Sequence, residues 1–184
     1  MVGEAIRAEL VQGNIIVWDA ESGRKLYRMG FYGKPLGISK PKSAEFDAPL
    51  ILDIIEAVYL VEENLLEVYE DGRKMSLEEL IEYAEKSYEN FGEKYQVYRD
   101  LRKRGFIVTP GIKFGSDFAV YRVGPGLEHA PFIVQVKLLG ESISAFEIVR
   151  SGRLATTVRK YFTIAVPDRS GGKPTYILFE WWRA

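Results

Sequence analysis

Three residues in the second half of this 184-residue chain have side chains that can move protons or stabilise a phosphate: Tyr121, His129 and Lys160. The pKa of histidine ordinarily lies nearest neutrality, that of tyrosine lies near about 10, and lysine offers a point charge to a phosphate oxygen. Such a trio suits metal-free RNA cleavage, in which a 2′-hydroxyl loses a proton, a 5′-oxygen gains one and the transition state needs a cation. A lone histidine is more often structural, so residue types alone leave both interpretations open.

The segments around these residues predict that they converge. Tyr121 ends one predicted strand, and a second predicted strand, 131–138, begins just after His129. If the two strands form a hairpin, both residues lie at the same end of the sheet. Lys160 ends a predicted basic helix and precedes a buried strand at 161–166.

The rest of the second half alternates strands with helices, which predicts a mixed α/β sheet. The predicted elements are a basic helix at 95–104, strands at 106–108 and 117–121, helices at 142–149 and 154–159 with a break near Ser151-Gly152, and a last strand at 175–182.

The first half predicts another small α/β unit. Its predicted elements are strands at 14–18 and 25–31 around a turn at 19–23, a long loop at 33–46, a helix capped by Asp47 with Pro49 in its first turn, a short strand at 65–69, and a helix from the Ser76 capping box to near Phe91. The composition shifts at Gly92, so we expect two domains, 1–92 and 93–184.

Net charge also divides the chain. Residues 1–92 carry 10 Lys+Arg and 18 Asp+Glu, a balance of −8, whereas residues 93–184 carry 15 and 8, a balance of +7. The basic half is therefore a candidate for binding a polyanion. The chain has no cysteine and no apolar run long enough to span a membrane, and its charged first residues are not expected to form a signal peptide. A reducing, cytoplasmic setting is expected.

Metal sites have little support in this sequence. A single histidine and no cysteine exclude multi-histidine and thiolate sites within one chain. Carboxylates are scarce in the basic half, where the plausible ligands are Asp117, Glu128, Glu147 and Asp168. Their spacing forms no ligand pattern, so a nuclease dependent on a divalent metal is disfavoured. No phosphate-binding glycine loop is present either.

At the residues that carry this chemistry, the sequence resembles the archaeal tRNA-splicing endonucleases, and among them the crenarchaeal type. The resemblance lies in Tyr98–Val108, Gly111–Tyr121, His129–Val134 and Arg153–Lys160, and more loosely in Ile54–Leu60 and Ser76–Leu80. It therefore spans nearly the whole chain, and its C-terminal motifs stand in the family's order and spacing.

The resemblance implies a catalytic subunit that needs no cofactor. Tyr121 would be the general base, His129 the general acid and Lys160 the cation that stabilises the transition state. The substrate would be precursor tRNA, cut at exon–intron junctions in a bulge-helix-bulge to leave a 2′,3′-cyclic phosphate and a 5′-hydroxyl. Two alternatives are a non-catalytic RNA-binding or structural subunit of the same assembly and a DNA nuclease on a related fold.

Family members hold a bulged base between two arginines. Arg153 matches the first by its place seven residues before Lys160, and Arg183 is the candidate for the second. The loop at 33–46 is longer than in compact members, as in some crenarchaeal forms. Its lysines, Lys34, Lys40 and Lys42, are candidates for contacts with the RNA backbone.

The resemblance also bears on assembly. Four-subunit members dock an acidic loop between the last strands into a neighbour, but here that loop, 166–172, has one acid, Asp168, followed by Arg169. A separate structural subunit is therefore expected to supply the docking contact in an α2β2 heterotetramer. The apolar last strand, Tyr176–Trp182, resembles the family's dimer seam and would favour pairing at a sheet edge.

Overall fold

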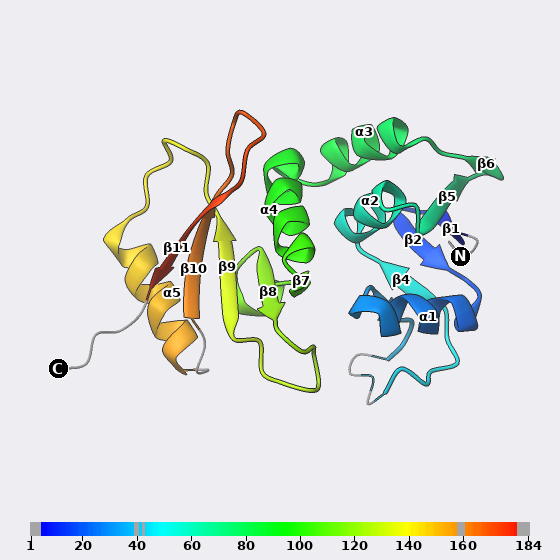
Figure 1. The fold of residues 1–184 in the computed structure, drawn as a ribbon, viewed down its shortest axis with the longest axis horizontal. Helices are drawn as coiled ribbons and strands as arrows, with labels where there is room; N and C mark the ends of the chain where they lie inside the picture. Colours follow the sequence, from blue (N-terminus) through cyan, green and yellow to red (C-terminus); the bar gives the residue numbers. More distant parts are fainter. Residues whose placement is uncertain (1–4, 39–40, 42, 158–160, 180–184) are drawn as a thin grey trace. The chain divides into compact units, whose positions relative to one another are not determined.

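The computed structural model describes residues 5–38, 41, 43–157 and 161–179. The chain divides into two compact units, Met1–Phe91 and Gly92–Ala184 (Figure 1). Each unit is a sheet with helices packed on it, so the fold is mixed α/β as predicted. Within the described part of the chain, no helix is long and apolar enough to cross a membrane.

The N-terminal unit contains a six-stranded sheet in the order β3-β4-β2-β1-β5-β6. The strands are β1 (Ile6–Val11), β2 (Asn14–Val17), β3 (Lys34–Pro35), β4 (Leu50–Leu52), β5 (Leu66–Glu70) and β6 (Arg73–Lys74). Central strand β1 pairs antiparallel with β2 and parallel with β5. The strands predicted at 14–18 and 65–69 are thus confirmed to within a residue.

The segment predicted as a strand at 25–31 is instead part of helix α1 (Ala20–Gly30), so that prediction was wrong. The Asp19 side chain caps the helix by accepting the Ser22 backbone N–H at 2.8 Å. The buried residues Gly23, Leu26, Tyr27 and Gly30 recur at helical spacing. The predicted turn at 19–23 is the helix cap and first turn, because an aspartate favours either structure.

Helix α2 (Ile54–Glu62) begins six residues later than predicted, because its cap is Asp53 and not Asp47. The Asp53 carboxylate accepts the Ile55 N–H, and the buried Glu56 carboxylate accepts the Asp53 N–H at 3.0 Å and the Gly33 N–H at 3.1 Å. The preceding apolar residues form strand β4, in which Leu50 and Leu52 are buried. Apolar residues before a helix fit its period as easily as they fit a strand.

Helix α3 (Leu77–Ser87) confirms the capping box predicted at Ser76. The Ser76 hydroxyl accepts the Glu79 N–H, and the Glu79 carboxylate accepts the Ser76 N–H. The helix ends at Ser87 and not near Phe91, where helix α4 (Phe91–Lys103) begins. The basic helix predicted at 95–104 is therefore present as part of α4, which ends one residue earlier, at Lys103.

The C-terminal unit contains a five-stranded sheet in the order β11-β10-β9-β8-β7. The strands are β7 (Ile107–Pro110), β8 (Phe118–Tyr121), β9 (Phe132–Val136), β10 (Tyr161–Val166) and β11 (Thr175–Phe179), with a 3-10 turn η1 (Ile112–Phe114) between β7 and β8. Strands β9 and β10 are parallel and the other neighbours antiparallel, which confirms a mixed sheet.

Two helices cover opposite faces of this sheet. On one face, helix α5 (Ala145–Thr157) packs against β10 over a core that includes Ile133 and Phe162. On the other face, the Tyr98 ring of α4 lies 5.9 Å from the Phe118 ring of β8. The faces differ because Phe118 pairs with Val134, and adjacent residues of a strand point to opposite sides.

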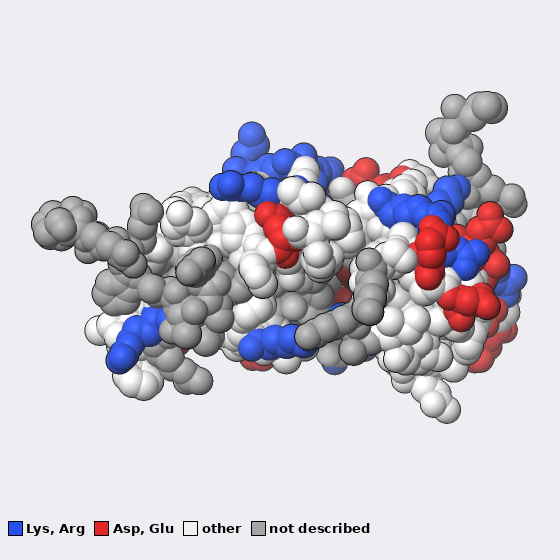
Figure 2. Space-filling model, turned by 90° about the horizontal axis from the view of Figure 1, so that it is seen from below, with Lys and Arg blue, Asp and Glu red and all other residues white. Residues whose placement is uncertain are grey.

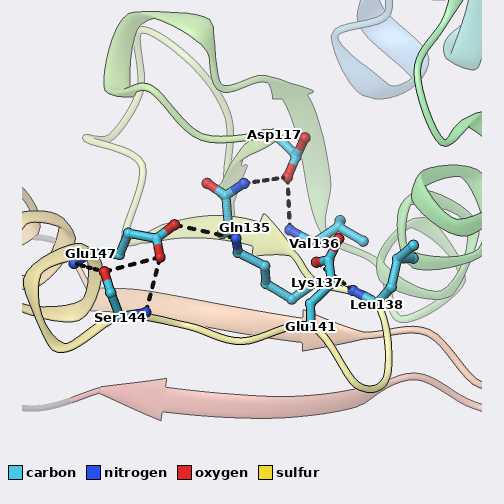
Figure 3. Close-up of polar contacts among 8 residues, drawn as sticks. All are labelled: Asp117, Gln135, Val136, Lys137, Leu138, Glu141, Ser144 and Glu147. Atoms are coloured by element: carbon cyan, nitrogen blue, oxygen red, sulfur yellow. Dashed lines mark hydrogen bonds and ion pairs between the residues drawn. The ribbon is translucent and has the colours of Figure 1, made fainter.

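Helix α5 is continuous, so the break predicted near Ser151-Gly152 was wrong. The Ser144 hydroxyl accepts the Glu147 N–H at 3.1 Å, and the Glu147 carboxylate accepts the Ser144 N–H at 3.0 Å (Figure 3). This cap fixes the start of the helix before Ala145. A glycine inside a helix costs about 1 kcal/mol relative to alanine, which weakens the helix without ending it.

Candidate active site

Strand pairing brings three segments of the C-terminal unit to one edge of its sheet. This edge is formed by the ends of strands and not by an outermost strand. Strand β8 ends there at Tyr121, and β9 begins there, because Val120 pairs with Phe132. Strand β10 begins at the same edge, because Tyr161 pairs with Phe132 and its N–H donates to the Pro131 carbonyl at 2.8 Å. The hairpin predicted between β8 and β9 is confirmed, and it places the loop that carries His129 beside Tyr121.

Lys160 lies outside the described residues. Its neighbour in sequence, Tyr161, is the first residue of β10 and lies at the edge where Tyr121 ends β8. The parallel pairing of β9 with β10, with α5 as the crossover, therefore brings the residue that follows Lys160 to the Tyr121 end of the sheet.

Tyr121 is half-buried. Burial raises the pKa of its phenol above the ordinary value of 10.0, and the nearby Glu128 carboxylate raises the pKa further, whereas a hydrogen bond with the Thr109 side chain lowers it. Thr109 lies diagonally across from Tyr121 on β7, because Ile107 pairs with Tyr121. The phenol is therefore protonated at neutral pH in the free chain, and a base role would need cations to reach it on substrate binding.

His129 is exposed in the loop between β8 and β9. The Gly124 carbonyl closes this loop by accepting the N–H groups of Leu127 at 3.2 Å and Glu128 at 3.1 Å. The histidine ring thus projects from a folded loop, accessible to a large substrate, and not from the apolar core.

Glu128 ties the same loop together, a role that the sequence does not predict. Its Oε1 atom accepts the backbone N–H groups of Arg122 and Val123, each at 2.5 Å. These hydrogen bonds, led by that from Val123, lower the pKa of the carboxyl group. A glutamate before a histidine in a glycine-rich loop matches no known motif, so the local sequence does not predict this hydrogen-bonding role.

Arg153 is exposed on α5, one helix turn before the helix ends. The cap formed by Ser144 and Glu147 orients this helix, and the Lys137 ammonium on the strand side contacts the Glu147 carboxylate at 3.3 Å (Figure 3). The guanidinium therefore has access to solvent on the helix that leads toward Lys160.

The carboxylates considered as metal ligands have other roles. Asp117 ties β8 to β9 by accepting the Val136 N–H at 2.7 Å and the Gln135 side-chain amide at 3.1 Å (Figure 3), and it pairs with Lys94 of α4 at 3.0 Å. Within the described ranges, no three His, Asp or Glu residues gather in a way that could hold a metal ion.

Comparison with known proteins covers both units. Residues 91–176 match the tRNA intron endonuclease, catalytic C-terminal domain, and residues 6–81 match the tRNA intron endonuclease, N-terminal domain. The chain is 49% identical to the tRNA-splicing endonuclease of Hyperthermus butylicus, over 96% of this chain and 98% of that protein. It is 44% identical to the tRNA-splicing endonuclease of Sulfurisphaera tokodaii, over 94% and 97% of the two chains.

The chain belongs to the tRNA-splicing endonuclease family. The archaeal sources of these relatives agree with the resemblance in the sequence. The match to the family's catalytic domain contains Tyr121, His129, Arg153 and Lys160.

The basic half of this splicing-endonuclease chain does not present all its cations to solvent. Arg102 of α4 is 7% exposed, and it donates to the Tyr98 hydroxyl at 2.9 Å and to the Val108 carbonyl at 3.0 Å. Arg104 pairs with Asp100 at 2.8 Å but stays exposed. Figure 2 shows one face of the molecule, on which carboxylates gather over the N-terminal unit and are sparse over the C-terminal unit.

The candidate RNA-contacting lysines and the second clamp arginine lie in other parts of the chain. Lys34 lies exposed in β3, at one edge of the N-terminal sheet. Lys40, Lys42 and Arg183 lie outside the described residues.

The last described strand, β11, lies at an edge of the C-terminal sheet. Ile177 and Leu178 are 46% and 49% exposed there. The Tyr176 hydroxyl anchors the strand to α4 by donating to the Asp100 carboxylate at 2.7 Å. Residues 180–182 of the predicted strand lie outside the described part of the chain.

Proposed function

We propose that this chain is the catalytic subunit of a tRNA-splicing endonuclease, with its active site in residues 93–184 and an N-terminal domain in residues 1–92. It cuts precursor tRNA at exon–intron junctions within a bulge-helix-bulge, without a metal ion. The observation that carries the proposal is the common sheet edge reached by the end of β8, the His129 loop and the start of β10.

In the proposed reaction, the 2′-oxygen of the nucleotide before the cut forms a bond to phosphorus, and the bond from phosphorus to the 5′-oxygen breaks. Tyr121, as the phenolate, takes the proton of the 2′-hydroxyl. His129 gives a proton to the leaving 5′-oxygen, and the Lys160 ammonium stabilises the charge on the phosphorane. The products carry a 2′,3′-cyclic phosphate and a 5′-hydroxyl.

RNA binding in this proposal depends on shape more than on sequence. The guanidinium of Arg153 stacks on a bulged base, with Arg183 as the second member of the clamp. The exposure of Arg153 on α5 supports this role. Lys34, Lys40 and Lys42 add contacts to phosphates, which any sequence offers.

We further propose an α2β2 heterotetramer in which a structural subunit supplies the acidic docking loop. The loop between β10 and β11 has Asp168 as its acid, and this carboxylate accepts the Ser170 N–H at 2.9 Å and the Ser170 hydroxyl at 2.8 Å. An acid that is already bound within its own turn is a poor docking group. The exposed edge strand β11 forms the dimer seam.

The test is cleavage of a bulge-helix-bulge precursor tRNA in EDTA, by the chain alone and by its mixture with a structural subunit. His129→Ala should lower the rate by about 10²–10⁴. Leu127→Ala, which truncates an exposed apolar side chain of the same loop, is the matched control and should stay within a factor of two.

Cutting that requires a divalent metal, or that His129→Ala leaves intact, would overturn the mechanism. RNA binding without cutting, in every mixture, would favour the RNA-binding subunit instead. Cutting by the chain alone would overturn the heteromeric assembly and leave the chemistry standing.

A further inference from the structure

One carboxylate connects the two sides of the proposed active-site loop. Glu128 directly precedes His129, and its Oε1 atom binds the N–H groups of Arg122 and Val123, which directly follow Tyr121. The end of the tyrosine strand and the residue before the histidine are therefore joined through a single side-chain oxygen.

Beyond the two backbone bonds to the Gly124 carbonyl, this loop contains two conformationally permissive residues. Gly124 and Gly126 adopt positive φ angles of 144° and 86°. Glycine has many alternative conformations, so a loop that contains two of them does not fix the direction of a later side chain by itself. A carboxylate bound by backbone N–H groups forms strong charge-assisted hydrogen bonds that select one conformation.

We propose that Glu128 is a positioning residue that holds His129 where it can protonate the leaving 5′-oxygen. This inference rests on the proposed function, because it acts through the general acid. The required precision is high, since a misplacement of about 1 Å at a reacting group can cost 10²-fold in rate.

A second effect of the same carboxylate makes the proposal testable. The Glu128 charge raises the pKa of Tyr121, so neutralising it favours the phenolate that takes the 2′-proton. Loss of the charge should therefore help the base step and harm the acid step. A general loss of structure would harm both.

The experiment compares two precursor tRNAs, one with the natural oxygen and one with sulfur in place of the scissile 5′-oxygen. A thiolate leaves without protonation, so the sulfur substrate makes the general acid unnecessary. Single-turnover rates are measured in EDTA, in the assembly that cuts, for wild type, Glu128→Gln, Glu128→Ala and His129→Ala.

Glu141→Gln is the matched control. The Glu141 carboxylate also accepts a backbone N–H, that of Leu138 at 3.0 Å, in an exposed loop at the other end of β9. Figure 3 shows this contact, which follows the Val136 end of β9, whereas β8 ends at Tyr121 beside the Phe132 end.

On the natural substrate, Glu128→Ala should lower the rate by about 10–100-fold, Glu128→Gln by less, and Glu141→Gln by less than twofold. On the sulfur substrate, both Glu128 variants and His129→Ala should cut at rates no more than a few-fold below the wild-type rate. Thermal melts establish that each variant is folded, and if Glu128→Ala is not, Glu128→Gln decides.

Three results would overturn the inference. Glu128 variants that cut the natural substrate at the wild-type rate would show that no positioning is needed. If the sulfur substrate restores the cleavage rate of His129→Ala but not that of the Glu128 variants, Glu128 acts on another step. The general-acid role of His129 would then be supported. Sulfur that fails to restore His129→Ala would remove the general-acid role and the inference together.

Discussion

The two units of this chain share one strand arrangement and differ in what stands at its edge. In each, a central strand has an antiparallel neighbour on one side and a parallel neighbour on the other. In the N-terminal unit, β1 lies between antiparallel β2 and parallel β5, and in the C-terminal unit, β9 lies between antiparallel β8 and parallel β10. A backbone hydrogen bond marks the start of the parallel pair in both units, but with the donor exchanged. The Ile6 N–H of the central strand β1 donates to the Leu65 carbonyl at 2.9 Å, whereas the Tyr161 N–H of the parallel neighbour β10 donates to the Pro131 carbonyl at 2.8 Å.

At that edge the N-terminal unit has Leu65 and, just after β2, Trp18, whose indole N–H donates to Glu9 at 3.0 Å. The C-terminal unit has Tyr121 and the His129 loop, with Lys160 next to Tyr161 in sequence. The arrangement brings three segments together in both units, but among the described residues the C-terminal edge has a tyrosine and a histidine, whereas the N-terminal edge has the Trp18 indole. The comparison teaches that such a fold supplies a meeting point and that side chains decide its chemistry.

The largest expected effect separates the two edges directly. Tyr121→Phe removes the proposed base and should lower the single-turnover cleavage rate by about 10²–10⁴. Trp18→Phe, the matched change at the N-terminal edge, should leave the rate within a factor of two. Equal losses in the two variants would mean that the edges do not differ in function.

The pH dependence sharpens the same contrast. Because the pKa of Tyr121 is raised above its ordinary value of 10.0, the phenolate is a minor species throughout the neutral range. At enzyme concentrations below saturation, the rate with the sulfur-substituted substrate reports the ionisation of the free chain, so it should rise about tenfold for each pH unit and should not level off below about pH 10. Levelling near neutrality under these conditions would exclude Tyr121 as the base.

RNA affinity is the next comparison between the units. Arg153→Ala removes a stacking cation and should weaken binding of an uncleavable precursor tRNA by about tenfold, in the range of one base–side chain stack. Arg73→Ala, in the N-terminal unit, removes an arginine that pairs with Glu79 at 2.8 Å and should change affinity by less than twofold. Filter binding at fixed salt concentration measures both.

The smallest expected effect is on stability. The pKa of Tyr176 is raised in the folded chain, mainly by burial and then by its hydrogen bond to Asp100. Its contribution is therefore complete below the unfolded pKa of about 10 and is lost as the pH rises above that value. Tyr176→Phe should lower the free energy of unfolding by about 1.5 kcal/mol at neutral pH and flatten its fall at high pH.

The matched change in the N-terminal unit is Tyr69→Phe, because the Tyr69 hydroxyl donates to Glu67 at 2.9 Å, and this hydrogen bond rather than burial is the main cause of the raised Tyr69 pKa. It should cost less stability than Tyr176→Phe in the same urea titrations. If it costs as much, burial does not distinguish the two hydrogen bonds.

Local sequence patterns predicted a helix or strand correctly wherever the spacing of apolar residues and the residues at the two ends of the segment indicated the same element. The Ser76 capping box, the basic helix before Gly105 and the strands around Tyr121 and 161–166 were predicted in this way. They were insufficient at residues 20–30, where a short segment fits both periods until packing on β4 and β2 selects the helix. The predicted start of α2 was wrong for the same reason, since Leu50–Leu52 becomes a strand only by pairing with β2 and β3.

The residue types and their order along the chain carry the candidate chemistry, the division of charge and the exclusion of thiolate metal sites. Tertiary structure alone decides that β10 lies parallel to β9, that β11 lies at the edge, that Arg102 is buried, and that Glu128 closes the His129 loop. The reason is physical. Strand order and the partner of a carboxylate depend on residues distant in sequence, and these come together only when the chain has folded.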